Sequence, residues 1–268
     1  MEDCEDASPL PMRLAVESSA AMLSAFTVAP VISIVDKAIV SNASGKEKLI
    51  SCLVNGFKTF FTRPVYFLRQ PAFLMIWGVY GGTYVVANSI EAIAERSKRS
   101  PVVPKFIGSS ATNVTLSVIK DKAYARMFGV GQPRPFPSVS LGLFATRDCM
   151  TILASFTLPT MVGEALDKRF AIGKQNADNL AQLTVPSLMQ FVSSPLHLYG
   201  LDKYNRSDRS LTFSDRFSRV RQEYLKTSLA RVGRIMPAFG VGGVVNKYVR
   251  KTGKDWLQGC YHPVKRNL

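Results

Sequence analysis

The sequence predicts an all-α membrane protein with six transmembrane helices, arranged as three two-helix repeats with short amphipathic helices on the inner side. An Asp-Lys pair recurs at near-equal spacing, and each copy closes an apolar stretch and precedes a basic segment and a second apolar stretch. Tandem units of this kind are the signature of repeat architectures. Hydrophobic residues make up 47% of the chain and charged residues 20%, a balance that favours membrane helices joined by polar segments. The three pairs are Asp36-Lys37, Asp121-Lys122 and Asp202-Lys203.

The first repeat is expected over residues 14–96. Residues 14–35 are almost free of charge, and about 20 helical residues suffice to cross the hydrocarbon of a bilayer. Pro30 is expected to kink this helix. Residues 46–61 place apolar side chains at helical spacing in a basic segment, which predicts an amphipathic helix at the membrane surface. The uncharged run at 72–90 then predicts the second transmembrane helix.

The second repeat is expected over residues 106–169. Its first stretch, 106–119, contains several Ser, Thr and Asn residues, so we expect a helix with one polar, water-facing side. Residues 129–137 are rich in Gly and Pro and predict a loop. The second stretch, 149–162, is uncharged, and Arg147 is expected near its start.

The third repeat is expected over residues 179–251. It has an apolar run at 180–201, a basic amphipathic segment at 206–226 and a glycine-rich run at 238–245. Arg231 and Arg234 are expected at the entrance of that last run.

The distribution of charge predicts a topology. The net charge is +15, and 20 of the 34 Lys and Arg residues lie in the segments within the repeats, at 37–69, 120–147 and 202–234. Loops on the inner side of a membrane are enriched in Lys and Arg, so we expect these segments inside. The acidic tail, 1–13, and the basic tail, 252–268, then lie on the other side. The acidic start resembles neither a secretory nor a mitochondrial leader, so internal targeting signals are expected.

Other classes of function find little support. The chain has no P-loop, nucleophile elbow or HExxH motif, so no enzyme, cofactor or catalytic residue is predicted. The basic segment around Phe213, Phe217 and Tyr224 suits nucleic-acid binding, but the repeated apolar stretches argue against it. We predict no metal site, because the His and Cys residues are scattered, and we expect the cysteines to be free thiols. The residues are Cys4, Cys52, Cys149, Cys260, His197 and His262.

The pattern resembles the mitochondrial carrier family, in a divergent form. In that family the first helix of each of three repeats ends in a Pro-x-Asp/Glu-x-x-Lys/Arg motif. Here each Lys follows its Asp directly, and the spacing from Pro to Asp is longer. The similar segments lie between about residues 14 and 251. They are Pro30 to Asp36-Lys37, Asp121-Lys122 with Arg126, Pro195 to Asp202-Lys203 with Arg206, Arg69-Gln70-Pro71, Arg147, and Arg234 to Pro237.

The resemblance implies a monomer in the mitochondrial inner membrane, with membrane lipids, cardiolipin among them, and a small-molecule substrate as partners. It also implies that the three Asp-Lys pairs form inter-repeat salt bridges that gate the matrix side. The alternative is that these charges only mark where helices leave the membrane. Arg69, Arg147, Arg231 and Arg234 are expected to contact lipid or substrate, or to extend to the interface without a specific ligand.

A substrate site is expected midway along the second helix of each repeat. Trp77, Tyr80 and Phe156 are cavity candidates there, with packing as the alternative. The stretches 72–90 and 149–162 carry no charge, which argues against a highly charged substrate. The sequence therefore predicts a carrier-like transporter of a small, weakly charged metabolite. The alternative is a structural or scaffold protein that keeps the fold without transport.

Overall fold

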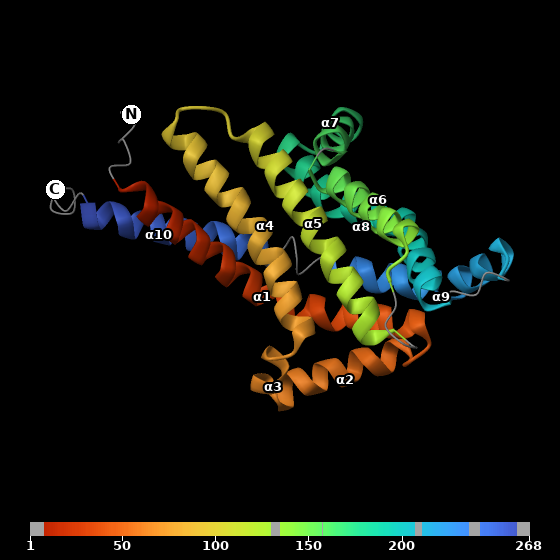
Figure 1. Cartoon of the computed structure of the whole chain (residues 1–268). Helices are drawn as coiled ribbons and strands as arrows, with labels where there is room; N and C mark the ends of the chain where they lie inside the picture. Colours follow the sequence, from red (N-terminus) through yellow and green to blue (C-terminus); the bar gives the residue numbers. More distant parts are fainter. Residues whose placement is uncertain (1–7, 130–134, 157, 207–210, 236–241, 262–268) are drawn as a thin grey trace.

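The computed structural model describes residues 8–129, 135–156, 158–206, 211–235 and 242–261, and these fold into α-helices joined by short connections, with no strand among them. The all-α prediction is therefore confirmed. The helices are α1 (Leu10–Ser44), α2 (Leu49–Thr62), α3 (Pro64–Leu68), α4 (Pro71–Arg96), α5 (Val102–Phe128), α6 (Ser138–Phe156), α7 (Leu158–Phe170), α8 (Lys174–Asn205), α9 (Phe213–Ile235) and α10 (Gly242–Tyr261) (Figure 1).

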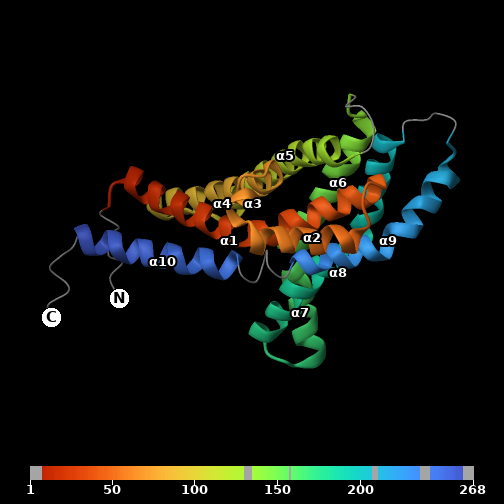
Figure 2. The same cartoon turned by 90° about the horizontal axis from the view of Figure 1, so that it is seen from below.

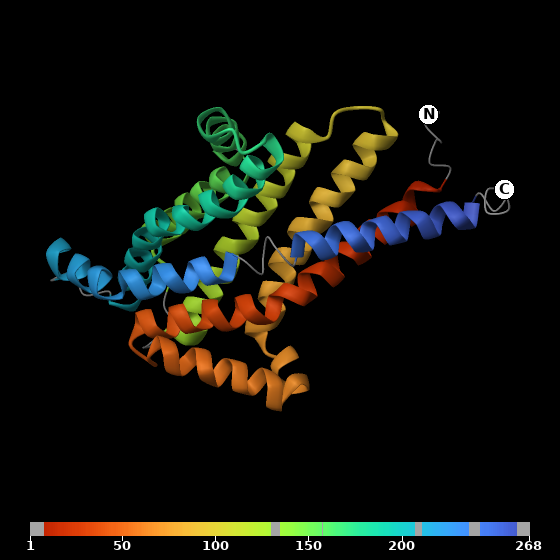
Figure 3. The ribbon, with the colours of Figure 1, turned by 180° about the vertical axis from the view of Figure 1, so that it is seen from behind.

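The long helices pack in a closed order around the middle of the molecule. Helix α1 packs on α4, α4 on α5, α5 on α6, α6 on α8 and α8 on α9, and α10 returns to α1. Figure 2 shows α10 running beside the first half of α1, and Figure 3 shows both termini at the same end of the molecule. The closing contact between α10 and α1 thus joins the last and first parts of the chain.

Small side chains allow the central contact between α1 and α4. Ala21, Ala25 and Ala29 of α1 are fully buried at four-residue spacing, so they lie on one face of the helix. Trp77 of α4 lies across this contact and donates its indole N–H to the carbonyl oxygen of Met22 at 2.9 Å. That bond ties α1 to α4, the two long helices of the first predicted repeat.

The first helix of each predicted repeat does not end at its Asp-Lys pair, contrary to the prediction. Helix α1 runs on from Asp36 to Ser44, where Gly45 adopts a left-handed φ of +81° and donates its N–H to the Asn42 carbonyl. Helix α5 runs on to Phe128 and α8 to Asn205. The aspartates are buried and paired with cations, so their charge gives the helix no reason to end.

Two predicted helix starts are also wrong. Helix α6 begins at Ser138, which places Arg147 in its middle, and α9 extends to Ile235, which places Arg231 and Arg234 near its end. The predicted starts were placed where apolar runs begin. A helix can extend beyond such a run, because it tolerates polar side chains on one face. Arg69 lies where expected, exposed at the junction between α3 and α4.

Helix α9 begins with a reciprocal cap. Thr212 donates its N–H and its hydroxyl to the Asp215 carboxylate at 2.9 and 2.6 Å, while the Asp215 N–H points back to the Thr212 hydroxyl. These hydrogen bonds lower the pKa of Asp215, which is fully exposed. They satisfy backbone donors in the first turn of the helix.

Two of the described helices, α1 and α4, are long and apolar enough to cross a membrane. Helices α5 and α8 are also long, but polar residues lower their hydropathy. Half of the predicted span 238–245, and part of the predicted loop 129–137, lie outside the described residues. Helix α10 continues to Tyr261, through residues that the sequence interpretation assigned to the C-terminal tail.

Gly56 permits the close approach of α2 to α1. A Cβ at this position would lie 2.6 Å from Cγ2 of Ile34, a stiff β-branched side chain. We expect Gly56→Ala to destabilise the protein by about 1–3 kcal/mol, because the clash outweighs the better helix propensity of Ala. Thermal unfolding in detergent measures this. Gly78→Ala is the matched control, since nothing lies within 4 Å of a Cβ there, and an equal effect of both changes would contradict the explanation.

Candidate functional site

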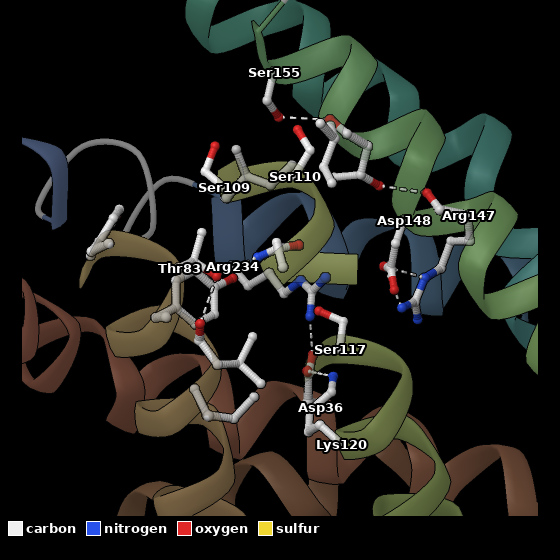
Figure 4. Close-up of a pocket in the computed structure, with 18 of the residues that line it drawn as sticks. Asp36, Thr83, Ser109, Ser110, Ser117, Lys120, Arg147, Asp148, Ser155 and Arg234 are labelled. Atoms are coloured by element: carbon white, nitrogen blue, oxygen red, sulfur yellow. Dashed lines mark hydrogen bonds and ion pairs between the residues drawn. The ribbon is translucent and has the colours of Figure 1, made fainter. Parts of the chain in front are cut away.

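A cavity of about 130 Å³ lies at the centre of the helix arrangement. Its lining comes from α1, α4, α5, α6, α8 and α9, so all three predicted repeats contribute. Figure 4 shows its polar side chains converging from several helices. We take this cavity as the candidate functional site, because apolar walls and a set of convergent polar and charged side chains are typical of ligand sites.

Hydroxyl and amide side chains line the cavity in helical stripes. Helix α5 contributes Ser109, Asn113 and Ser117, which lie on one face because four residues make about one turn. This is the polar face that the stretch 106–119 predicted, although the sequence interpretation did not assign it to a site. Thr151 and Ser155 of α6 form a second stripe at the same spacing. The cavity can therefore exchange hydrogen bonds with an uncharged polar ligand.

A buried chain of charges borders the cavity. Asp36 pairs with Lys120 at 2.7 Å and also with Arg234, and Lys120 in turn contacts Asp121 at 2.7 Å. Arg147 continues the chain, with one guanidinium nitrogen 2.5 Å from both Asp121 and Asp148. We call these six residues the Asp36 network. It joins α1, α5, α6 and α9 and contains three carboxylates and three cations. Figure 4 shows Asp36, Lys120, Arg147, Asp148 and Arg234 of this network.

The cations of this network are not the lysines of the Asp-Lys pairs. A residue that directly follows Asp points about 100° away around the helix, so it faces a different neighbour. Lys37 lies 5.5 Å from the centre of the Phe128 ring, and Lys203 lies 5.8 Å from that of Tyr199. Lys122 forms no ion pair with any residue that the structure describes.

The three aspartates are not equivalent. Lys120 brings Asp36 and Asp121 into one cluster, whereas Asp202 pairs with Arg206 at 2.5 Å and with Arg216 at 2.9 Å. Both partners of Asp202 follow it within the third predicted repeat. Among the described residues, Asp36 is thus the aspartate that links all three predicted repeats, through Lys120 and Arg234.

Arg147 is the most highly connected cation of the site. Besides its two carboxylates, it donates to Nδ1 of the buried His197 at 2.7 Å. A guanidinium is always a donor, so Nδ1 is an acceptor and the His197 proton resides on Nε2. The second oxygen of Asp148 (Oδ2) and the hydroxyl of Ser110 line the cavity without a hydrogen-bond partner among the described residues. Both atoms are buried, and both can still accept a hydrogen bond.

The aromatic residues that were predicted to line a cavity do not all do so. Tyr80 lines the cavity, whereas Trp77 packs between α1 and α4, stacked against Phe73 with ring centres 6.4 Å apart. The side chain of Phe156 lies outside the described residues. Among the lipid or substrate candidates, Arg147 and Arg234 line the cavity and Arg231 lies directly behind it, while Arg69 is exposed at a distance from it.

A second ionic cluster lies toward the other end of α1. Glu17 is fully buried there and pairs with Arg13 at 3.2 Å and with Arg250 of α10. Arg250 also reaches Glu91 of α4 at 3.2 Å, and Glu91 pairs with Lys105 of α5. We call these five residues the Glu17 network. The sequence interpretation missed it, although Glu17 stood out as a charge inside an apolar stretch.

Two side-chain amides form a further contact between α4 and α10, next to the Glu17 network. Asn88 and Asn246 exchange reciprocal hydrogen bonds of 3.0 and 3.1 Å between α4 and α10. Each lies about one turn before a member of the Glu17 network on its own helix. The contact between α4 and α10 is therefore held by polar groups over more than one turn.

No group of three or more His, Cys, Asp or Glu residues in the described part of the chain is placed to hold a metal ion. Comparison with curated proteins finds no match. A family model described as "probable citrulline exporter" matches residues 20–254. The matched range covers most of the chain and includes the cavity lining and the Asp36 network, and it supports a role as a membrane transporter. The chain belongs to this family of probable citrulline exporters.

Proposed function

We propose that the protein is a multi-pass membrane transporter that moves a small zwitterionic amino acid through the central cavity. Citrulline is the substrate that the family's description suggests. One observation carries the proposal: the cavity combines charges of both signs with stripes of hydroxyl and amide groups. A zwitterion with an uncharged polar side chain has the same combination.

The ends of an amino acid have complementary groups in the site. Oδ2 of Asp148 accepts the ammonium group, since it has no other partner among the described residues. Arg234 donates to the carboxylate, because only one of its N–H groups is engaged, with Asp36. Arginine binds carboxylates with paired, charge-assisted hydrogen bonds. A carbamoyl side chain then faces Ser109, Asn113 and Ser117.

Substrate binding at Arg234 weakens the closure of the cavity. The substrate carboxylate competes with Asp36 for the same guanidinium, so binding and loosening of the Asp36 network are linked. The Glu17 network lies 19 residues away along α1, roughly 28 Å at 1.5 Å per residue. We propose that the two networks open in turn, which exposes the cavity to one side of the membrane at a time.

The membrane arrangement is part of the proposal. It comprises six spans in the repeats 14–96, 106–169 and 179–251, with the segments within the repeats on the matrix side of the mitochondrial inner membrane. The resemblance to mitochondrial carriers and the basic charge support it. Helix α2 exposes Ile50, Val54 and Phe61, which suits a helix lying in the membrane interface. Arg69, exposed nearby, is placed for a lipid head group such as that of cardiolipin.

Uptake by proteoliposomes tests the proposal. We expect labelled citrulline to accumulate in vesicles containing the protein, and unlabelled citrulline to compete. Analogues that lack the carboxylate or the ammonium group should compete at least about tenfold less well, because each leaves a buried charge of the site without its partner. Glutamate, with its extra negative charge, should compete weakly.

Empty vesicles and vesicles with the Asp148→Asn variant are the controls. Asp148→Asn keeps the shape of the side chain but removes its charge, so uptake should fall while the protein remains folded. Absence of uptake by the wild-type protein, with folding verified by thermal unfolding, would reject citrulline transport and favour the structural or scaffold alternative.

A further inference from the structure

We propose that Arg231 and Gln190 form a charge filter that admits amino acids with neutral side chains and excludes those with cationic ones. The inference rests on the proposed function and adds to it the basis of selectivity. It predicts that the protein distinguishes citrulline from arginine, which have nearly the same shape and differ in the charge of the side chain.

Arg231 is a buried cation without a carboxylate partner. Only 1% of its surface is exposed, and it forms no ion pair with any residue that the structure describes. Its hydrogen bonds go to neutral groups: Nε donates to Oε1 of Gln190 at 3.0 Å, and a terminal nitrogen donates to the Ser193 hydroxyl at 3.2 Å. Neutral groups do not neutralise a buried charge, and the protein interior screens it only weakly. The electrostatic potential of Arg231 therefore extends into the neighbouring cavity.

Gln190 separates this charge from the cavity that it lines. Both ends of its amide are engaged, since Oε1 accepts from Arg231 and Nε2 donates to the Pro186 carbonyl at 3.0 Å. The Gln190 side chain is therefore fixed in position. Arg231 is hydrogen-bonded to Gln190, which lines the cavity, and so lies directly behind the lining.

The packing of α8 against α9 keeps this geometry rigid. Pro195 has no N–H, so the Phe191 carbonyl one turn earlier lacks its usual helical donor. Tyr224 of α9 replaces that donor, with its hydroxyl 3.1 Å from the Phe191 oxygen. This hydrogen bond links α8 to the helix that carries Arg231.

The charges around the cavity do not cancel Arg231. The Asp36 network contains three carboxylates and three cations, which balance one another. Arg231 thus adds an uncompensated positive charge beside the described lining. At an effective dielectric constant of about 20 and a separation of about 10 Å, repulsion between like unit charges disfavours a second cation by roughly tenfold.

The test is the ratio of arginine uptake to citrulline uptake in proteoliposomes. We expect the wild-type protein to prefer citrulline and Arg231→Gln to raise the ratio about tenfold. Gln190→Glu should raise it similarly, because a carboxylate beside Arg231 cancels the charge while it keeps the hydrogen bond. Arg231→Lys retains the charge and should retain the preference. Arg221→Gln, at an exposed position on α9, is the matched control and should leave the ratio unchanged.

The outcomes separate this inference from the proposed function. No citrulline uptake by the wild-type protein would overturn both. Wild-type citrulline uptake with an unchanged ratio in folded Arg231→Gln and Gln190→Glu proteins would overturn the filter alone, as would a wild-type protein that takes up arginine equally well. A purely structural role of Arg231 lowers abundance or Tm in the variants without moving the ratio. If Arg231→Gln does not fold, the uptake ratios of Gln190→Glu and Arg231→Lys test the filter instead. A raised ratio in the first variant and an unchanged ratio in the second support it, and an unchanged ratio in Gln190→Glu overturns it.

Discussion

Replacing Asp36 by Asn is expected to abolish transport and to destabilise the protein by about 3–5 kcal/mol, the usual cost of removing one partner of a buried ion pair. The side chain of Asp36 is 6% exposed and pairs with both Lys120 and Arg234. After the change, Lys120 keeps only Asp121, and Arg234 has no carboxylate partner among the described residues. The contact that joins α1 to both α5 and α9 is lost.

Thermal unfolding and proteoliposome uptake measure this effect, with Asp255→Asn at an exposed position of α10 as the control. A double-mutant cycle isolates the pair. Arg234→Gln on the Asp36→Asn background should cost less than in the wild-type protein, because Arg234 is already unpaired. Strict additivity of the two changes would show that the pair contributes nothing, and that Asp36 only marks a helix position.

Replacing Arg147 by Met is expected to have the largest effect of any single change in the site. Arg147 is 2% exposed, and its loss leaves Asp121 and Asp148 without their shared cation and His197 without its donor. Lys120 and Arg234 then remain for three carboxylates, and Asp148 loses its ion-pair partner among the described residues, so the site loses its balanced charge pattern. We expect little folded protein and no measurable uptake.

Arg147→Lys refines this prediction. A lysine keeps the charge but not the planar fork that reaches two carboxylates and an imidazole together, so stability should recover in part while uptake stays low. Arg169→Met, at an exposed position of α7, should change neither property. Full uptake by a folded Arg147→Lys protein would show that charge alone, and not the geometry of the guanidinium, matters at this position.

The sequence allowed the all-α fold and most helix positions to be predicted, because apolar runs report which stretches are buried or embedded in lipid. The helix ends were predicted less well. Apolar runs stop at Asp36 and start again after Arg147, yet α1 and α6 continue through these charges. The charges are neutralised by partners elsewhere in the chain, and a run of hydropathy contains no information about such partners.

The candidate site was predicted only in part for the same reason. Asp36 and Asp121 were identified, but the pairing of Asp36 with Lys120 spans 84 positions and depends on the rotation of two helices about their axes. The polar stripe of α5 was visible as Ser109, Asn113 and Ser117 at four-residue spacing. Its assignment to a cavity required knowing which helices face it.

The ionic contacts of α1 have a consequence for biogenesis. Its two buried acids each obtain an arginine from the third predicted repeat: Asp36 from Arg234, 198 positions later, and Glu17 from Arg250, 233 positions later. Helix α1 is therefore synthesised well before two of its arginine partners. Until they arrive, Glu17 has only Arg13 of its own helix as an ion-pair partner among the described residues, and Asp36 has only Lys120 of α5. A chain interrupted before α9 thus keeps both acids incompletely paired, and incompletely paired acids are expensive in lipid.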